Sequence, residues 1–374
     1  MALNLDSIRI EVGGKDISKM VTGVTLYESI FGLLRGAIAV KDGVNFFDNF
    51  IGSTLEEVNM AFSYIESEYD CGFMMDGISN MKIDKQQKNY IIHVQSVHTP
   101  VFAQRVNSMY SGTSDEIIEQ VFRDISAEQA ELIIDNTCDT SGRYIAPNVT
   151  AREALGVLVN NAYDNEKTGM FLYERLVDQT ALRLTSLSGM FNNNFVDSGG
   201  DPVSVKSSSV DMETNFVDIV GTANTFELKK YNMDFIQKLE DGVYGEEVNV
   251  INLDETTRVN NVTKEYTSIP KTKFKLSNKL YDENVKSIFS TRGDVAVSSI
   301  VNHKIREFNT AMEITGMVAL PNLGVGMSID LQLGGGNTSN SKQDGVYIIK
   351  HIQHNFTQDG GEYSYSQNLG LARN

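Results

Sequence analysis

The chain has 374 residues, of which 41% are hydrophobic and 22% charged, so it is long enough for two or three domains with substantial cores. The start, MALNLDSIRIEV, lacks the basic and apolar regions of a signal peptide, and the most apolar run, residues 30–40, contains Arg35, so we expect neither a targeting segment nor a membrane span. The formal net charge of −17 argues against stable binding to nucleic acid, because an acidic chain repels phosphates.

Alternating side chains predict β-strands in the first hundred residues. Residues 8–12 and 58–64 place an apolar side chain at every second position, the period of a strand with one buried face. Residues 81–83 and 90–97 flank the polar stretch DKQQKN and predict a hairpin. About six short strands at this spacing favour a barrel or a sandwich.

The stretch TLYESIFGLLRGAIAVKDGVNFFD, residues 25–48, does not fit a single element. It begins as a strand, breaks at residues 29–32, resumes as the strand RGAIAV, and ends in an aromatic pair, Phe46 and Phe47. We therefore expect a bent extended segment made of two strands.

Two helices are predicted in the middle of the chain. Thr113 with Glu116, and Thr150 with Glu153, have the spacing of a capping box and precede apolar side chains at helical spacing. MFLYERL and TALRLTSLS predict two strands after the second helix, and the Ser-, Asn- and Gly-rich residues 188–210 predict a loop or linker. We expect a small α+β module over 106–205.

Strand patterns return in the last part of the chain. They cover residues 217–228 and 246–250, then 327–333, and finally VYIIKHIQHNF and EYSYSQNLGL, which are joined at 359–361. Residues 256–299 are polar and weakly patterned and predict an insertion, while 299–312 favour a short helix. The end of the chain therefore resembles its beginning in kind, without a residue-level repeat.

No pattern of a catalytic, cofactor or metal site stands out. His351 and His354 lie at an odd separation in a predicted strand, so they point to opposite faces, as do His93 and His98. The glycine runs lack the lysine and the following helix that phosphate binding needs, and Cys71 and Cys138 are too isolated for a zinc site or a disulfide framework. We predict no catalytic residue, no cofactor and no metal; the cysteine usage fits a reduced cytoplasmic origin.

Three stretches together resemble the baseplate hub proteins of contractile-tailed phages and related injection machines. The opening IRIEVGGKDISKMVTGVTLYESIFGLLRGAIAVKDGVNFFDNFIG is similar to the start of that family, including the break at Glu28–Ser29–Ile30. TAREALGVLVNNAY followed by TGMFLYERL resembles its middle helix and aromatic strand, and the ending from GVGMSIDLQLGG to EYSYSQNLGLAR resembles its last strands. The family's C-terminal lytic or spike domain has no counterpart in this sequence, and residues 256–299 have no counterpart in the family.

The resemblance implies a mainly β fold with α+β insertions, built from two tail-tube-like β-barrels and an intervening helix-containing module. The first barrel would cover 1–105, the middle module 106–205, and the second barrel 206–255 and 300–374, with 256–299 inserted. Three copies would form a pseudo-sixfold ring that joins a hexameric tail tube to a trimeric spike in the virion, after assembly in the host cytoplasm. The implied partners are the tube, the spike, other baseplate proteins, and DNA in transit through an acidic lumen, with no stable membrane binding.

The bent segment would staple one barrel to its neighbour in such a ring. The candidate interface residues are Glu28, Ser29, Ile30, Phe31, Arg35, Phe46 and Phe47. Two other functions stay open: a cell-wall-degrading or receptor-binding tail component, and a cytoplasmic β-rich binding protein. The first lacks paired catalytic signatures and fibre repeats, and the second leaves the ordered resemblance unexplained.

Overall fold

The computed structural model describes most of the chain outside one long region. The described residues are 3–50, 56–65, 67–84, 87–126, 131–139, 141–165, 168–178, 181–192, 203–207, 222–223, 225–231, 245–251, 259–265, 274–275, 310–320, 322–333 and 344–373. Most of the predicted insertion at 256–299 and the glycine run 334–336 lie outside them.

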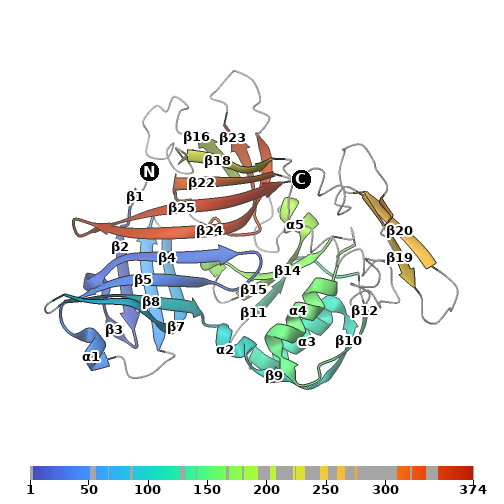
Figure 1. The fold of residues 1–374 in the computed structure, drawn as a ribbon, viewed down its shortest axis with the longest axis horizontal. Coiled ribbons are helices and arrows are strands. Elements are labelled where there is room, and N and C mark those ends of the chain that lie inside the picture. The colour runs from blue at the N-terminus through green and yellow to red at the C-terminus, as the bar shows by residue number, and fades with distance from the viewer. Residues whose placement is uncertain are drawn as a thin grey trace.

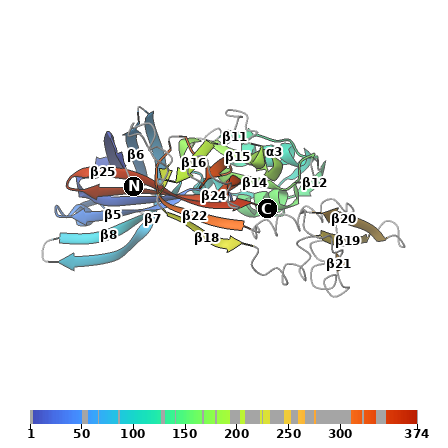
Figure 2. The ribbon, with the colours of Figure 1, turned by 90° about the horizontal axis from the view of Figure 1, so that it is seen from above.

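The first part of the chain forms strands with one short helix. Its elements are β1 (Leu3–Asn4), β2 (Ser7–Val12), β3 (Lys15–Asp16), the 3₁₀ turn η1 (Ser18–Met20), β4 (Val21–Ser29), β5 (Arg35–Asp42), α1 (Phe46–Phe50), β6 (Glu57–Tyr64), β7 (Ser67–Asp84) and β8 (Gln87–Ser96). The β7–β8 hairpin extends beyond its neighbours (Figure 2).

The middle part mixes helices with short strands. Its elements are α2 (Thr99–Phe102), β9 (Arg105–Val106), β10 (Met109–Thr113), α3 (Ser114–Ser126), β11 (Glu131–Ile134), β12 (Ser141–Ile145), β13 (Val149–Thr150), α4 (Ala151–Asn161), β14 (Met170–Glu174), η2 (Leu176–Asp178), β15 (Ala181–Ser186) and α5 (Leu187–Phe191). Both predicted helices are confirmed: at α4 the Thr150 side chain accepts the Glu153 N–H and the Glu153 carboxylate accepts the Thr150 N–H.

The last part returns to strands. They are β16 (Val203–Ser207), β17 (Thr222–Ala223), β18 (Thr225–Tyr231), β19 (Gly245–Ile251), β20 (Val259–Glu265), β21 (Phe274–Lys275), β22 (Thr310–Val318), β23 (Ser328–Gln332), β24 (Gly345–Asp359) and β25 (Glu362–Arg373). The prediction of a mainly β fold is confirmed.

One sheet of 15 strands connects the two ends of the chain. Its main path runs β17-β16-β23-β24-β4-β5-β8-β7-β6-β2-β3, and β25 pairs with β24, β22 and β1. The first and last parts of the chain meet where β24 pairs antiparallel with β4, with His351 opposite Ser29 and Thr357 opposite Gly23. Figure 1 shows β24 and β25 lying along β4 and β5.

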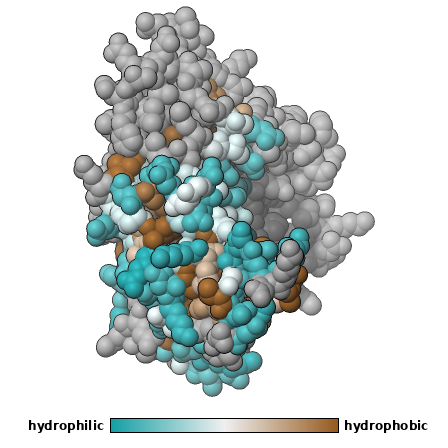
Figure 3. All heavy atoms as spheres, turned by 90° about the vertical axis from the view of Figure 1, so that its left-hand side faces the viewer, coloured by the Kyte–Doolittle hydropathy of each residue, from teal (hydrophilic) through white to brown (hydrophobic). Residues whose placement is uncertain are grey.

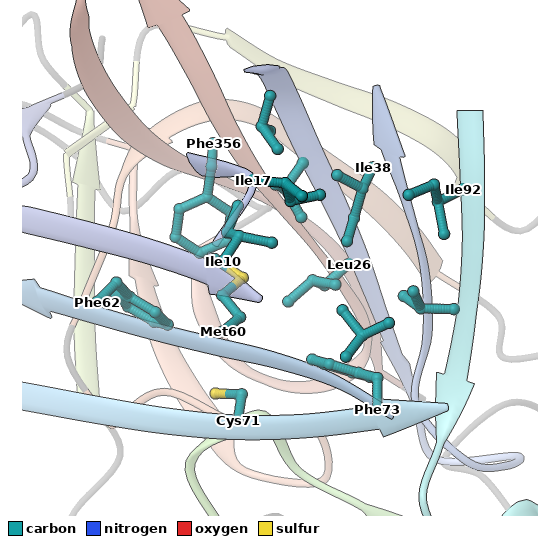
Figure 4. Close-up of a cluster of buried hydrophobic side chains, with 14 of the residues drawn as sticks. Ile10, Ile17, Leu26, Ile38, Met60, Phe62, Cys71, Phe73, Ile92 and Phe356 are labelled. Atoms are coloured by element: carbon teal, nitrogen blue, oxygen red, sulfur yellow. The ribbon is translucent and has the colours of Figure 1, made fainter. Parts of the chain in front are cut away.

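Three clusters of buried side chains form the interior. The N-terminal core lies between β4, β5 and β8 on one side and β2, β6 and β7 on the other; in Figure 4, Leu26, Ile38 and Ile92 point toward Met60 and Phe73. The middle core joins α3 and α4 to β14 and β15, and the C-terminal core lies among β22 to β25.

Two of the cores include side chains from distant parts of the chain. Leu176, Ala319 and Phe356 belong to the N-terminal core, although they come from η2, the segment after β22, and β24. Ile30, Phe171 and Tyr173 belong to the C-terminal core. The three parts therefore share buried surface rather than packing as separate units.

Three local predictions are wrong. The loop expected over 188–210 begins inside α5 and contains β16, and Thr310–Met312, expected to be helical, lie in β22. The hairpin connection DKQQKN is much shorter than expected, because Asp84 closes β7 and Gln87 opens β8. In each case strand pairing or the packing of a short helix overrides the preference of the local sequence.

No helix in the described part of the chain is long and apolar enough to cross a membrane. Figure 3 shows mostly hydrophilic residues on the described part of one face, with hydrophobic residues in small groups.

Candidate functional site

The end of β4 carries a buried carboxylate on which donors from three parts of the chain converge. Glu28 is 1% exposed. Its Oε1 accepts the backbone N–H of Leu176 at 2.7 Å, and its Oε2 accepts that of Val325 at 3.0 Å. His354 Nε2 lies 3.1 Å from Oε1. Glu28 thus ties β4 to η2, to the loop before β23, and to β24.

A chain of polar groups continues from Glu28 through the last two strands. His354 Nδ1 lies 2.7 Å from the Tyr365 hydroxyl, which also accepts a bond from Gln367 Nε2 at 3.1 Å. Gln367 Oε1 then accepts the N–H of Leu320 at 3.1 Å. All three side chains are buried, so this network fixes how β24 and β25 sit against the end of β22.

A second buried carboxylate, that of Glu174, lies near enough to Glu28 for the two charges to interact. Glu174, at the end of β14, accepts the N–H of Leu34 at 3.1 Å through Oε2. Its Oε1 lies 3.8 Å from His98 Nε2, too far for a hydrogen bond, and has no hydrogen-bond partner among the residues that the structure describes. Burial, supported by the negative charge of Glu28, raises the pKa of Glu174 to about 7 although Ser96 and Leu34 donate to it.

Arg175 follows directly and points into the C-terminal part. Its Nε donates to the carbonyl of Val325 at 3.0 Å, and its guanidinium lies 5.7 Å from the centre of the Tyr173 ring. A Cβ at Gly324 would lie 2.7 Å from Arg175 Cδ, so only glycine leaves room for this side chain. We call Glu28, Glu174, Arg175, His98 and His354, with the backbone they bind, the junction.

The predicted interface residues of the bent segment separate into buried and exposed members. Glu28 and Ile30 are buried and contact other parts of their own chain, while Ser29 is half-buried. Phe31 is 42% exposed, with its ring 5.9 Å from that of Phe171, and Arg35 is exposed beside Tyr27. The exposed members are available to a neighbouring molecule, and that role remains a prediction.

Phe46 and Phe47 lie at the far end of the segment, in α1. The carboxylate of Asp42 accepts the N–H groups of both residues and of Val44, which starts this short helix. Burial works to raise the pKa of Asp42, but these three bonds outweigh it and hold the pKa below its ordinary value. Phe46 is buried and Phe47 packs edge-on against Tyr90, so the structure does not bring them near Phe31 and Arg35.

A groove opens beside the junction, between the β4–β5 connection and α4. It has a volume of about 460 Å³ and is lined by Phe31, Leu33, Leu155 and Phe171, with Arg35 and Arg152 among its polar residues. Among the described residues, no group of three or more His, Cys, Asp or Glu could hold a metal ion.

Sequence reasoning missed most of the junction. It treated His354 as an ordinary histidine and assigned no role to Glu174 or Arg175. One signal was present in the sequence. Glu174 and Arg175 end the apolar stretch MFLYER, and charged side chains in a buried strand need hydrogen-bond or ion-pair partners.

Comparisons with known proteins support the fold. No protein-family model and no curated protein sequence matches the chain. Among solved structures, a 43 kDa tail protein of prophage MuSo2 from Shewanella oneidensis aligns with a TM-score of 0.62 and 10% identity, over 98% of each chain. A tail protein from Neisseria meningitidis aligns with a TM-score of 0.59 and 8% identity, over 98% of this chain and 96% of that one.

A third similar structure comes from a secretion machine. An Escherichia coli component of the type VI secretion system, described as structurally similar to the phage T4 tail proteins gp27 and gp5, aligns with a TM-score of 0.51 and 9% identity. The alignment covers 98% of this chain and 76% of that one. The fold is therefore that of phage tail proteins and hub-like components, which confirms the resemblance seen in the sequence at the level of fold.

Proposed function

We propose that this chain is a structural hub of a contractile phage tail baseplate. Three copies form a pseudo-sixfold ring that adapts the hexameric tail tube to the trimeric central spike and leaves a lumen for DNA. The chain works as a component of the virion tail, assembled in the host cytoplasm. Its other partners are baseplate proteins.

The observation that carries this proposal is the alignment along almost the full length of two tail proteins. An alignment that long includes the middle part and the junction, not only a common β-module. At identities of 8–10% the likeness concerns the fold, so the function is our inference from it.

The 15-stranded sheet supports the proposed adaptor role. Because β4 pairs with β24, displacement of one half of the chain is transmitted to the other through backbone hydrogen bonds. The buried network around Glu28 adds bonds between the same parts. Such a body keeps its shape when tube and spike pull on opposite faces.

The likeness to tail proteins supports a non-enzymatic role, and the acidic composition is compatible with DNA passage. A wall with net negative charge repels phosphates and lets DNA slide past without binding. The alternative is a cell-wall-degrading or receptor-binding tail component.

The native mass of the purified chain tests the proposal, measured alone and with the tail's spike protein, followed by two-dimensional averaging of electron micrographs. We expect a trimer with three-fold symmetry, six lobes and a central hole, which binds the spike. A compact monomer in both samples would contradict the hub. Digestion of peptidoglycan by the purified chain would favour the alternative.

A further inference from the structure

The groove beside the junction combines an apolar lining with positive charge, in a chain of the opposite net charge. Phe31, Leu33, Leu155 and Phe171 line it, and the lining includes Arg35 and Arg152 but no acidic residue. Both arginines are exposed, and the chain as a whole has 49 acidic against 32 basic residues. An occupant that matches this surface must bring carboxylates together with small or apolar side chains.

The outer face of β6 and β7 has that composition. Its outward-facing side chains include the exposed acids Glu57, Glu68, Asp70 and Asp76, together with Ala61, Gly72 and Met74. Neither strand has a lysine or arginine over 57–76, and the exposed Arg9 on the neighbouring β2, opposite Ala61, is paired with Glu11. We call this surface the acidic face.

The acidic face and the groove cannot meet within one molecule. Met60, Phe62, Cys71 and Phe73 of the same strands point into the N-terminal core (Figure 4), so the alternating residues of β6 and β7 point away from it. The groove is lined by the β4–β5 connection and α4, with residues of α2 and β14, and by no residue of β6 or β7. The two surfaces can therefore combine only between copies.

We propose that the groove is the docking site for the acidic face of a second copy of this chain. If two grooves faced each other across a two-fold axis, Arg35 and Arg152 would lie against the same arginines of the other copy. Repulsion between these like charges disfavours that contact. The contact is therefore head-to-tail. Head-to-tail contacts close into a ring when the rotation between copies permits it. The proposal rests on the proposed trimer and assigns its contact surfaces.

Charge reversal on each surface, alone and combined, tests this contact. The groove variant is Arg35→Glu with Arg152→Glu, and the face variant is Glu68→Lys with Asp70→Lys. All four side chains are exposed, so these variants should fold; unchanged circular dichroism and thermal unfolding would verify that. Arg143→Glu, at an exposed position of β12 outside the groove lining, is the matched control.

We expect each double variant to assemble more weakly than the wild type and the control. The concentration below which its oligomer dissociates, measured by sedimentation velocity, should be at least about tenfold higher. A chain that carries all four substitutions exchanges the charges across the contact and should assemble again. That recovery separates a direct contact from a general change of surface charge.

The outcomes distinguish this inference from the hub proposal. If the wild type forms trimers and the groove variant assembles equally well, the groove is not the contact, although the trimer stands. If the wild type forms dimers or filaments that the variants lose and the fourfold variant regains, the contact stands and the trimeric hub is wrong. A wild type that stays monomeric at all concentrations would overturn both, and failure of the fourfold variant to reassemble would overturn the pairing.

Discussion

At the scale of single residues, buried carboxylates hold the parts of the chain together. Glu28 is accommodated because two backbone N–H groups and His354 satisfy its oxygens. The resemblance identified this residue as important, but as a contact to a neighbouring molecule. Composition and spacing could not have placed its partners, because Leu176, Val325 and His354 are more than a hundred residues away in the sequence.

Glu28→Ala should destabilise the folded chain strongly. The change leaves two N–H groups and His354 buried without their acceptor, which costs on the order of 3–5 kcal/mol of unfolding free energy. Urea unfolding would measure this. Glu119→Ala, which removes an exposed ion pair with Arg123 on α3, should cost about 0.5 kcal/mol or less. Equal losses for the two variants would contradict the role of the junction.

Glu174 should make stability depend on pH. Its pKa in the folded chain, about 7, is above the ordinary 4.5, so the folded state binds this proton more tightly than the unfolded state. The stability that the bound proton gives to the folded chain is fully present below about pH 4.5 and is lost as pH rises through 7. Glu174→Gln cannot ionise and should lack this loss.

The measurement is the unfolding free energy of wild type and Glu174→Gln between about pH 4 and pH 8. The unfolding free energy of Glu174→Gln, relative to that of the wild type, should increase by on the order of 3 kcal/mol from the low to the high end of this range. A constant difference for Glu174→Gln would mean that the carboxyl group ionises as it does in water.

At the scale of elements, prediction succeeded where a segment's own side chains determine its structure. The alternation of Ile8, Ile10 and Val12 gave β2, and the capping boxes gave α3 and α4. It placed the hairpin correctly at 81–83 and 90–97, but it assigned DKQQKN to the connection, whereas Asp84 ends β7 and residues 87–89 begin β8, where they pair with Lys82, Ile83 and Asp84. Such pairing is tertiary information that a local pattern does not contain.

Gly36 in β5 provides a test at this scale. A Cβ at this position would lie 2.7 Å from the backbone oxygen of Thr25 and 2.5 Å from Leu26 Cδ2, both in β4. Gly36→Ala should therefore push β4 and β5 apart and lower the unfolding free energy by about 1–3 kcal/mol. Gly77→Ala in β7, where no atom lies within 4 Å, is the control and should be nearly neutral in urea unfolding. A neutral Gly36→Ala would show that the strands have room.

At the scale of the whole molecule, the joining of the chain's two ends is the feature that local sequence patterns could not reveal. The 15-stranded sheet depends on β24 lying beside β4, more than three hundred residues earlier. The family resemblance implied two similar β-units and a stapling strand pair between neighbours. In the structure, β4 makes such a connection within one chain, to β24.

This arrangement predicts that β4 and β24 unfold together. They share backbone hydrogen bonds, the Glu28–His354 contact and the N-terminal core, to which β24 contributes Phe356. Hydrogen exchange followed by mass spectrometry at increasing urea should give amides of Val21–Ser29 and Gly345–Asp359 the same opening free energy and the same urea dependence. Helix α3, whose apolar side chains lie in the middle core, is the internal comparison, and the prediction does not depend on its opening free energy. If β24 stays protected after β4 has exchanged, the two halves open separately, which would contradict the proposal that the chain transmits force as one body.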